Sequence, residues 1–365
     1  MSGGVDSSVA AALLKRAGFD VIGVFMKFLS EPRGGSTLIN TDEKTDLHRY
    51  ENRCCTLESE RRARKVAKIL KIPFYVFNFE KEFKKRIVDR FLDGYKKGIT
   101  PNPCVVCNKE IKFGLLLEKA LALDADFVAT GHYAKKKEVL NFSTGVEKVK
   151  YKLLRGRDKN KDQSYFLWML NREQLKRILF PIGDYTRKEV EELAKKFKLP
   201  FRGVRKSQEI CFIQTTVNDF LGKYLSPNPG LIVDTTEKEL GRHQGLYSYT
   251  IGQRKGIGLP GGPYYVLDKD LKKNILIVTK NEKDLLKKEL IAENVNWIAG
   301  KEPKLPLKIK AKIRYRHQPA LAIITKNLED RIYTLKFKES QRAITPGQSV
   351  VFYKGEELLG GGIIK

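Results

Sequence analysis

The chain has 365 residues, 41% of them hydrophobic, which is enough for two or three globular domains with buried cores. This composition excludes an intrinsically disordered chain, and no apolar run is long enough to span a membrane. The 70 Lys and Arg residues outnumber the 43 Asp and Glu residues, and the net charge of +27 favours a polyanionic partner such as nucleic acid. A Lys-rich genome would supply part of the same excess.

No secretion signal precedes the first motif, so we expect a cytoplasmic protein. The five cysteines are an odd number, which in this setting indicates reduced thiols rather than a disulfide scaffold. Their spacing is therefore more informative than their number.

The first informative stretch is residues 1–8 (MSGGVDSS), directly before an apolar helix. Glycines let the backbone approach a ligand closely, and a helix start offers unpaired N–H groups that suit a phosphate. Ser7 and Ser8 are expected to add hydroxyl donors and to cap the helix. The spacing is not that of the P-loop, G-x-x-x-x-G-K-[ST], and its Lys is missing. Gly-Gly before a helix is often an ordinary turn, but the full pattern SGGVDSS resembles the pyrophosphatase loop of enzymes that cleave ATP to AMP and pyrophosphate.

Helices and strands then alternate along the chain. Apolar spacing predicts helices over 9–16, 57–70 and 83–95, and strands over 20–28, 74–79 and 127–130. Residues 29–53 are polar and predict a loop or flexible insertion. This order is typical of a parallel α/β sheet, in which ligands lie at the carboxyl ends of the strands. A strand should also precede the first loop, and we interpret its lack as a truncated or misassigned start.

The pattern changes after about residue 205. Residues 220–275 are rich in glycine and aromatic residues, and short alternating strands are expected over 307–316, 320–325, 331–337 and 349–353. Such short strands separated by turns favour a small C-terminal β-barrel. We therefore expect three domains, with limits at 1–204, 205–282 and 283–365.

A cysteine motif stands at residues 101–109 (PNPCVVCNK). The two prolines disfavour a helix across 101–103, so a helix is expected from near Cys107. Cys104 and Cys107 then lie near a helix start beside Lys109, which is expected to lower a thiol pKa and to make a nucleophile or a metal ligand. C-x-x-C is also half of a zinc site, but no second such pair exists. Cys211 is the other candidate, whereas Cys54 and Cys55 are interpreted as small buried residues.

Three further segments are more polar than a purely structural role would need. Residues 161–164 (KDQS) lead straight into an aromatic run. Residues 130–133 (TGHY) follow a strand end, where His132 is either a ligand contact or an ordinary surface residue. Residues 314–316 (RYR) fall on an expected barrel strand, as a solvated face or as an RNA contact in which Arg binds phosphate and Tyr stacks.

Together these segments resemble the tRNA-specific 2-thiouridylase (MnmA) family. The matching stretches run from residue 2 to residue 364 and read SGGVDSS, GVFMKF, TPNPCVVCNKEIKFG, ATGHY, KDQSYFL, ICFI, HQGL, TIGQRKG, KIRYR, TPGQSVVFY and LGGGII. The resemblance implies an ATP-pyrophosphatase (adenine nucleotide alpha hydrolase-like) domain, a small central domain and a C-terminal β-barrel.

The resemblance also implies a reaction. ATP, with Mg²⁺, would adenylate the C2 oxygen of the wobble uridine (U34) of tRNA. A persulfide on Cys211 would displace AMP to give 2-thiouridine, and Cys107 would assist sulfur release and form a disulfide with Cys211. A cysteine desulfurase or a sulfur-relay protein would supply the sulfur. The implied ATP-binding residues are Met1, Ser2, Gly3, Gly4, Val5, Asp6, Ser7, Met26 and Gly131.

Further positions match family contacts to tRNA. Asn102 and Pro103 would flank the target base, with Cys104 beside them. The other implied tRNA contacts are His132, Lys161, Asp162, Gln163, Arg314, Tyr315 and Gln348.

One position departs from a known form of the family, in which an Asp proposed as an acid/base residue follows Asn-Pro. This chain has Cys104 there, so the Asp role is in doubt, and Cys104 joins Cys107 and Cys211 as a catalytic candidate. Three thiols are enough to hold a [4Fe–4S] cluster with one open iron, as related tRNA thiolases do. A persulfide and an iron–sulfur-bound sulfide therefore remain alternative sulfur carriers.

Two other functions share part of this pattern. An amide-forming ATP-pyrophosphatase ligase would need the first loop but neither the thiols nor a basic barrel. An RNA-binding protein with an inactive nucleotide site would not need an intact Gly-Gly-x-Asp-Ser loop. Pyrophosphate exchange that depends on tRNA containing U34 would separate the three functions.

Overall fold

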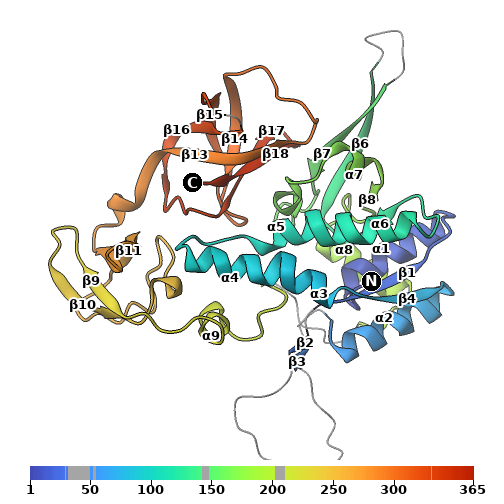
Figure 1. Cartoon of the computed structure of the whole chain (residues 1–365). Helices are drawn as coiled ribbons and strands as arrows, with labels where there is room; N and C mark the ends of the chain where they lie inside the picture. The colour runs from blue at the N-terminus through green and yellow to red at the C-terminus, as the bar shows by residue number, and fades with distance from the viewer. Residues whose placement is uncertain (29, 32–49, 52–54, 142–147, 202–209, 330) are drawn as a thin grey trace, which may run out of the picture.

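The computed structural model describes residues 1–28, 30–31, 50–51, 55–141, 148–201, 210–329 and 331–365. Figure 1 shows an N-terminal α/β part, a central part with short strands, and a C-terminal barrel. The barrel lies beside the hairpin of the N-terminal part, and the central part lies at the end of a long helical run. The expected loop at 29–53 lies outside the described residues, except for two short paired strands within it.

The N-terminal part alternates helices and strands, as the periodicity predicts. Two parallel pairs, β1 with β4 and β5 with β8, confirm the parallel α/β character of this part. Its first elements are α1 (Val5–Arg16), β1 (Gly23–Lys27), β2 (Ser30–Glu31), β3 (Tyr50–Glu51), α2 (Leu57–Leu70), β4 (Phe74–Asn78), α3 (Glu80–Phe83), the π-helix η1 (Lys84–Val88) and α4 (Asp89–Lys96). It continues with α5 (Pro103–Cys107), the π-helix η2 (Asn108–Leu115), α6 (Leu116–Leu121), β5 (Val128–Ala129), β6 (Ala134–Asn141), β7 (Lys148–Arg155), the 3₁₀ turn η3 (Ser164–Leu167), α7 (Arg172–Lys176), β8 (Ile178–Leu179) and α8 (Arg187–Lys196).

Helix α2 shows how local sequence sets an element. Its N-cap Thr56 accepts a hydrogen bond from the Ser59 N–H, and Lys71 ends the helix in the left-handed conformation at φ +51°. Ala63 and Val66 recur on one face and are fully buried, while Arg64 and Lys65 between them are exposed.

A core of aromatic side chains lies beneath the helices that carry the cysteine motif. Phe83, Phe91 and Phe113 are almost fully buried, and Phe212 packs edge-on against the first two. Burying a side chain of this size contributes roughly 1.5–3 kcal/mol each. The core therefore ties the residues around Cys211 to helices α3 to α6.

The central part forms a four-stranded sheet in the order β10-β9-β12-β11 within the described residues. Its own small core contains Ile232, Val266 and Leu276, all fully buried. The elements are α9 (Val217–Gly222), β9 (Gly230–Val233), β10 (Glu239–His243), the 3₁₀ turn η4 (Leu246–Ser248), β11 (Tyr265–Asp270), β12 (Ile275–Thr279) and the 3₁₀ turn η5 (Glu282–Leu285).

The C-terminal barrel is confirmed, and in the described residues six strands close it in the order β13-β16-β15-β14-β17-β18, with β18 pairing back to β13. Closure leaves no free sheet edge among these six strands. They are β13 (Leu286–Trp297), β14 (Leu307–Lys312), β15 (Ala320–Lys326), β16 (Tyr333–Arg342), β17 (Ser349–Lys354) and β18 (Glu357–Ile364).

The β6–β7 hairpin, which the sequence analysis did not predict, joins the N-terminal part to the barrel. Leu153 and Leu154 of β7 pair with Leu358 and Glu357 of β18, so the hairpin extends the barrel sheet. Lys152 adds an ion pair to Glu357 at 2.7 Å. The limits predicted for the three domains stay a prediction.

Two local expectations were wrong. Helix α5 begins at Pro103, four residues before the expected start, because proline fits the first helical position, where its missing N–H costs nothing. Residues 314–316 lie in a turn after β14, and the His317 N–H closes that turn on the Arg314 carbonyl. The expected strand over 307–316 was too long, because the alternation of apolar and polar residues continues beyond Lys312, where β14 ends.

Candidate active site

The first candidate residues form a compact loop before α1. The Ser2 N–H donates to Ser7 Oγ at 3.1 Å, and the hydroxyls of Ser7 and Ser8 donate to the Gly4 carbonyl. The expected capping by these serines was therefore wrong, since the N-cap is Gly4 and no side chain caps the helix. The first-turn N–H groups are thus left without a side-chain partner, which suits an anion.

Asp6 is held by two residues from distant parts of the chain. The Tyr133 hydroxyl donates to Asp6 Oδ1 at 2.8 Å, and the Arg187 guanidinium donates to the same oxygen at 2.6 Å. Burial, followed by the nearby Asp6 carboxylate, raises the pKa of Tyr133 well above its usual range. Tyr133 closes the TGHY segment, but nothing in the sequence marked Arg187 as a partner of Asp6.

Gly131 lies against the same loop. A Cβ atom at this position would stand 2.6 Å from the Asp6 carbonyl carbon and from the Ser7 nitrogen, so only glycine permits this approach. Met26 lies near the end of β1, where it pairs with Phe77 of β4 and packs against the main core. That Met26 and Gly131 border the bound nucleotide stays a prediction.

Cys104 and Cys107 both lie on helix α5, and Cys211 packs against the same hydrophobic core as Cys107. Burial, then the Cys211 thiol, raises the pKa of Cys104 to about 12. Burial also raises the pKa of Cys107 to about 12, against the lowering effect of Lys112. The expectation of lowered thiol pKa values was wrong, because removal from water outweighs the helix start and the nearby cations.

The thiols do not form a metal centre as placed. Among the described residues, no group of three or more His, Cys, Asp or Glu side chains is arranged to hold a metal ion. A [4Fe–4S] cluster would bind each of Cys104, Cys107 and Cys211 through a different iron, and this alternative stays a prediction. Cys54 lies outside the described residues, and Cys55 is partly buried against the main core.

The segments expected to contact tRNA differ in how far their side chains are exposed to solvent. His132 is 8% exposed, and its Nδ1 forms a 2.8 Å hydrogen bond with the Thr130 hydroxyl. The ring packs beside Phe113 and Phe180. Burial, and then the charge of Lys112, lowers the pKa of His132 well below its ordinary value. The placement fixes the imidazole as neutral, and its contact with tRNA stays a prediction.

Asp162 and Gln163 hold their own segment in place. The Asp162 carboxylate is 2% exposed and accepts hydrogen bonds from the Arg155 side chain and from the N–H groups of Gly156 and Ser164. Gln163 Oε1 accepts from the Tyr133 N–H at 3.0 Å. Lys161 beside them is only partly buried, and the three tRNA contacts remain predictions.

Tyr315, one of the barrel candidates, packs against the η3 turn that follows the KDQS segment. Tyr315 stacks at a tilt on Phe166, with ring centroids 4.5 Å apart, and Tyr165 lies next to both. The Tyr165 hydroxyl donates to the Ser349 carbonyl and also interacts with the Asn102 side chain. Sequence reasoning missed Tyr165, although it directly follows the KDQS segment.

Arg314 and Gln348 make internal contacts. Arg314 donates to the carbonyls of Arg342 and Ala343, and burial, then the charge of Arg342, lowers its pKa. Gln348 donates to the Thr100 carbonyl at 2.8 Å. Their expected contacts with tRNA stay predictions.

No helix in the described part of the chain has both the length and the apolar character needed to cross a membrane.

Comparisons with known proteins cover the whole chain. A family model described as tRNA methyl transferase HUP domain matches residues 1–215, one described as tRNA methyl transferase PRC-barrel domain matches 218–280, and one described as Aminomethyltransferase beta-barrel domain matches 287–364. The chain is 45% identical to tRNA-specific 2-thiouridylase MnmA 1 of Thermoanaerobacter pseudethanolicus, over 100% of the chain and 96% of that protein. It is 43% identical to tRNA-specific 2-thiouridylase MnmA of Clostridium perfringens, over 100% of the chain and 97% of that protein. The chain therefore belongs to the tRNA-specific 2-thiouridylase family of tRNA sulfurtransferases.

Proposed function

We propose that this protein converts the wobble uridine of tRNA to 2-thiouridine at the expense of ATP. The observation that carries the proposal is that Cys107 and Cys211 share one buried core, with Cys104 on the same helix as Cys107, in a chain matched over its full length by named 2-thiouridylases. A ligase that forms amides would have no use for such a thiol group.

ATP would bind at the loop formed by residues 1–7. The uncapped start of α1 offers N–H groups to its phosphates, and Met26 and Gly131 would border the nucleoside. Mg²⁺ would arrive with ATP as part of the substrate and would help to neutralise the departing pyrophosphate. The Arg187 guanidinium, fixed beside Asp6, would add positive charge at the same end of the loop.

The first chemical step makes a leaving group. The uridine C2 oxygen attacks the α-phosphorus of ATP, and the bond from that phosphorus to pyrophosphate breaks. A carbonyl oxygen is a poor leaving group, whereas AMP leaves readily once the oxygen has been adenylated. The target uridine has to leave its stack in the anticodon loop to reach Asn102 and the thiols.

The second step transfers sulfur. The terminal sulfur of a Cys211 persulfide attacks C2 and AMP leaves, which joins the base to Cys211 through a disulfide bond. The Cys107 thiolate then attacks the Cys211 sulfur, releasing 2-thiouridine and leaving a Cys107–Cys211 disulfide. An external thiol reductant returns both residues to thiols, and a persulfide donor such as a cysteine desulfurase or a sulfur-relay protein reloads Cys211.

Lys112 supports this chemistry electrostatically. It lowers the pKa of Cys107 against the effect of burial, so it favours the thiolate that the second step needs. Cys104 occupies the position of the family's Asp, and neither of the two steps above uses its thiol as a nucleophile. We assign Cys104 to shaping the base pocket.

The tRNA would be bound through the overall excess of positive charge together with contacts near the thiols. The net charge of +27 provides the long-range attraction, and Lys161, Arg314, Tyr315 and Gln348 are the family positions nearest to this role. A cytoplasmic location, where tRNA and ATP are found, stays a prediction.

The function is tested with purified protein, ATP, Mg²⁺, a persulfide source and a transcript carrying U34. Mass spectrometry of the digested tRNA should find 2-thiouridine at that position, with one AMP formed per modified base. A transcript with cytidine at position 34 is the matched control and should stay unmodified. AMP formation without 2-thiouridine in the U34 transcript would contradict the proposed function.

A further inference from the structure

All three parts of the molecule meet at Thr100, two residues before the N-cap of helix α5. The Thr100 N–H donates to the Pro346 carbonyl at 2.9 Å, and the Thr100 carbonyl accepts from Gln348 Nε2 at 2.8 Å. The Thr100 hydroxyl lies 3.2 Å from the Thr250 hydroxyl of the central part. One residue thus holds hydrogen bonds to the central part and to the C-terminal barrel.

The barrel segment that reaches Thr100 is seated tightly. Gly347 has a φ of +86°, and a Cβ atom there would lie 2.9 Å from Ile99 Cβ and 3.0 Å from the Thr100 nitrogen. Only glycine combines this backbone conformation with such a close approach. The segment 346–348 is therefore fitted to the backbone of residues 99–100 and leaves little room for another arrangement.

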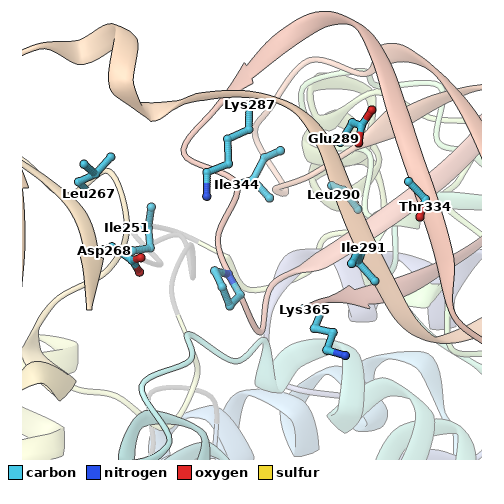
Figure 2. Close-up of a pocket in the computed structure, with 11 residues that line it drawn as sticks. Ile251, Leu267, Asp268, Lys287, Glu289, Leu290, Ile291, Thr334, Ile344 and Lys365 are labelled. Atoms are coloured by element: carbon cyan, nitrogen blue, oxygen red, sulfur yellow. The ribbon is translucent and has the colours of Figure 1, made fainter. Parts of the chain in front are cut away.

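The packing beside this contact is open. Figure 2 shows Ile251 and Leu267 of the central part facing Lys287 and Ile344 of the barrel across a cavity of about 400 Å³. Pro346 lines the same cavity. Apolar contact also joins the two parts beside the cavity, since Ile251 and Leu267 pack against a buried cluster that includes Ala343. The hydrogen bonds of Thr100 therefore add a polar link to an interface that is only partly filled.

Thr100 leads directly into the reactive residues. Asn102 is the N-cap of α5, Pro103 is its first residue, and the helix carries Cys104 and Cys107. We propose that Thr100 and Thr250 are positioning residues, which use the central part and the barrel to hold the loop 99–103 and its thiols in the reactive position. This inference rests on the function proposed above and adds two residues that act through the loop, without touching the substrates.

The hydroxyl pair is tested by substitutions that keep its shape. Thr250→Val removes the hydroxyl, Thr250→Ser retains it, and Thr100→Val removes its partner. Loss of a typical hydrogen bond changes a rate constant or an equilibrium constant by about fivefold. Under single-turnover conditions with saturating tRNA and ATP, each Val variant should thiolate about fivefold more slowly, and the Ser variant should stay within about twofold of the parent. The double Val variant should be no slower than either single one, because the two share one interaction.

A matched control is available on the outer face of the barrel. Thr325 also donates its hydroxyl to an internal acceptor, the Thr334 carbonyl, at 3.3 Å. Thr325→Val should leave the single-turnover rate unchanged. A decrease equal to that of Thr250→Val would show a general loss of stability and would overturn the assignment.

A second measurement needs neither tRNA nor ATP. Iodoacetamide should label Cys104 and Cys107 about fivefold faster in Thr250→Val than in the parent or in Thr250→Ser, because a loosened loop exposes the buried thiols more often. If Thr250→Val were labelled at the same rate as the parent, the inference would be overturned. It would also be overturned if Thr250→Val lost only affinity for tRNA. If the parent protein made no 2-thiouridine, the proposed function would fail, while the labelling rates would still decide the role of Thr250.

Discussion

Asp6 Oδ1 accepts hydrogen bonds from both the Tyr133 hydroxyl and the Arg187 guanidinium, at 2.8 and 2.6 Å. One carboxylate oxygen in the N-terminal loop is thereby tied to the segment after β5 and to the first residue of α8. The Arg187 N–H in turn donates to Asp158 Oδ2, and Asp158 Oδ1 accepts from the Lys161 N–H, so the arrangement reaches the KDQS segment as well. The nucleotide loop and a segment expected to contact tRNA are thus joined through a few polar contacts.

Removing the Tyr133 hydroxyl should weaken this arrangement. Tyr133→Phe should lower the free energy of unfolding by about 1 kcal/mol, because Asp6 loses a partly buried hydrogen bond. It should also raise the KM for ATP, since the loop is less well fixed. Urea denaturation and pyrophosphate release measure the two effects, and Tyr75→Phe on the exposed side of β4 is the control, because Tyr75 is 51% exposed. An unchanged KM with an unchanged stability would contradict a role for this contact.

The buried thiols give a pH dependence with a definite sign. Cys104 and Cys107 have pKa values of about 12 in the folded chain against an ordinary value of 9.0. A raised pKa means that the folded state holds its protons more tightly, so the stabilisation is complete below about pH 9 and is lost as pH rises toward 12. The free energy of unfolding should therefore fall between pH 9 and 10.5, and less steeply in Cys104→Ala. An identical slope in the parent and the variant would contradict the burial of this thiol.

Lys112 should set the reactivity of Cys107. Lys112→Gln removes the cation that lowers the Cys107 pKa, so fewer molecules carry the thiolate at a given pH. Release of 2-thiouridine should slow about tenfold at pH 7.5 and recover partly at pH 9, where more thiolate forms. Lys109→Gln, on the same π-helix, is the comparison, and an equal loss in both variants would argue against a specific effect of Lys112.

Arg314, beside the end of barrel strand β14, is one of the residues predicted to contact tRNA. Arg314→Ala should weaken tRNA binding and reduce the slope of log affinity against log salt by about 1, if the guanidinium also reaches a phosphate. Its hydrogen bonds to the Arg342 and Ala343 carbonyls predict a loss of barrel stability as well. Binding isotherms at several salt concentrations separate the two effects, because a purely structural role would leave the salt slope unchanged.

Iron analysis distinguishes the two sulfur carriers considered from the sequence. If a Cys211 persulfide carries the sulfur, protein purified without oxygen should contain no stoichiometric iron or acid-labile sulfide. Cys104→Ala should give the same result. Iron at cluster level that disappears in the variant would make Cys104 a ligand and would contradict the persulfide mechanism.

Periodicity in the sequence predicted much of the fold. The apolar spacing of residues 57–70 gave helix α2 with both limits correct, and the alternation at 307–353 gave four strands of the barrel. These signals are local, since one buried face repeats within each element. The β6–β7 hairpin was missed although β7 alternates lysines with apolar residues, because the lysine run of β6 shows no such alternation. Its pairing with β18 also joins residues about 200 positions apart.

The candidate site was predicted less completely, for a physical reason. Motifs identified the thiols and the N-terminal loop, but they carried no information about burial. Burial reverses the expected direction of the pKa shifts of Cys104 and Cys107. The contacts of Asp6 with Arg187 and of Thr100 with Thr250 join residues 181 and 150 positions apart, and short-range patterns do not reveal such pairs.

The most direct test of the mechanism is a single-turnover reaction with persulfide-loaded parent protein and Cys211→Ala, followed by mass spectrometry of the tRNA. The parent should place one sulfur at C2 of U34 and form a Cys107–Cys211 disulfide, while Cys211→Ala should bind tRNA nearly as well and make no 2-thiouridine. Formation of 2-thiouridine by Cys211→Ala would contradict the assignment of Cys211 as the sulfur carrier.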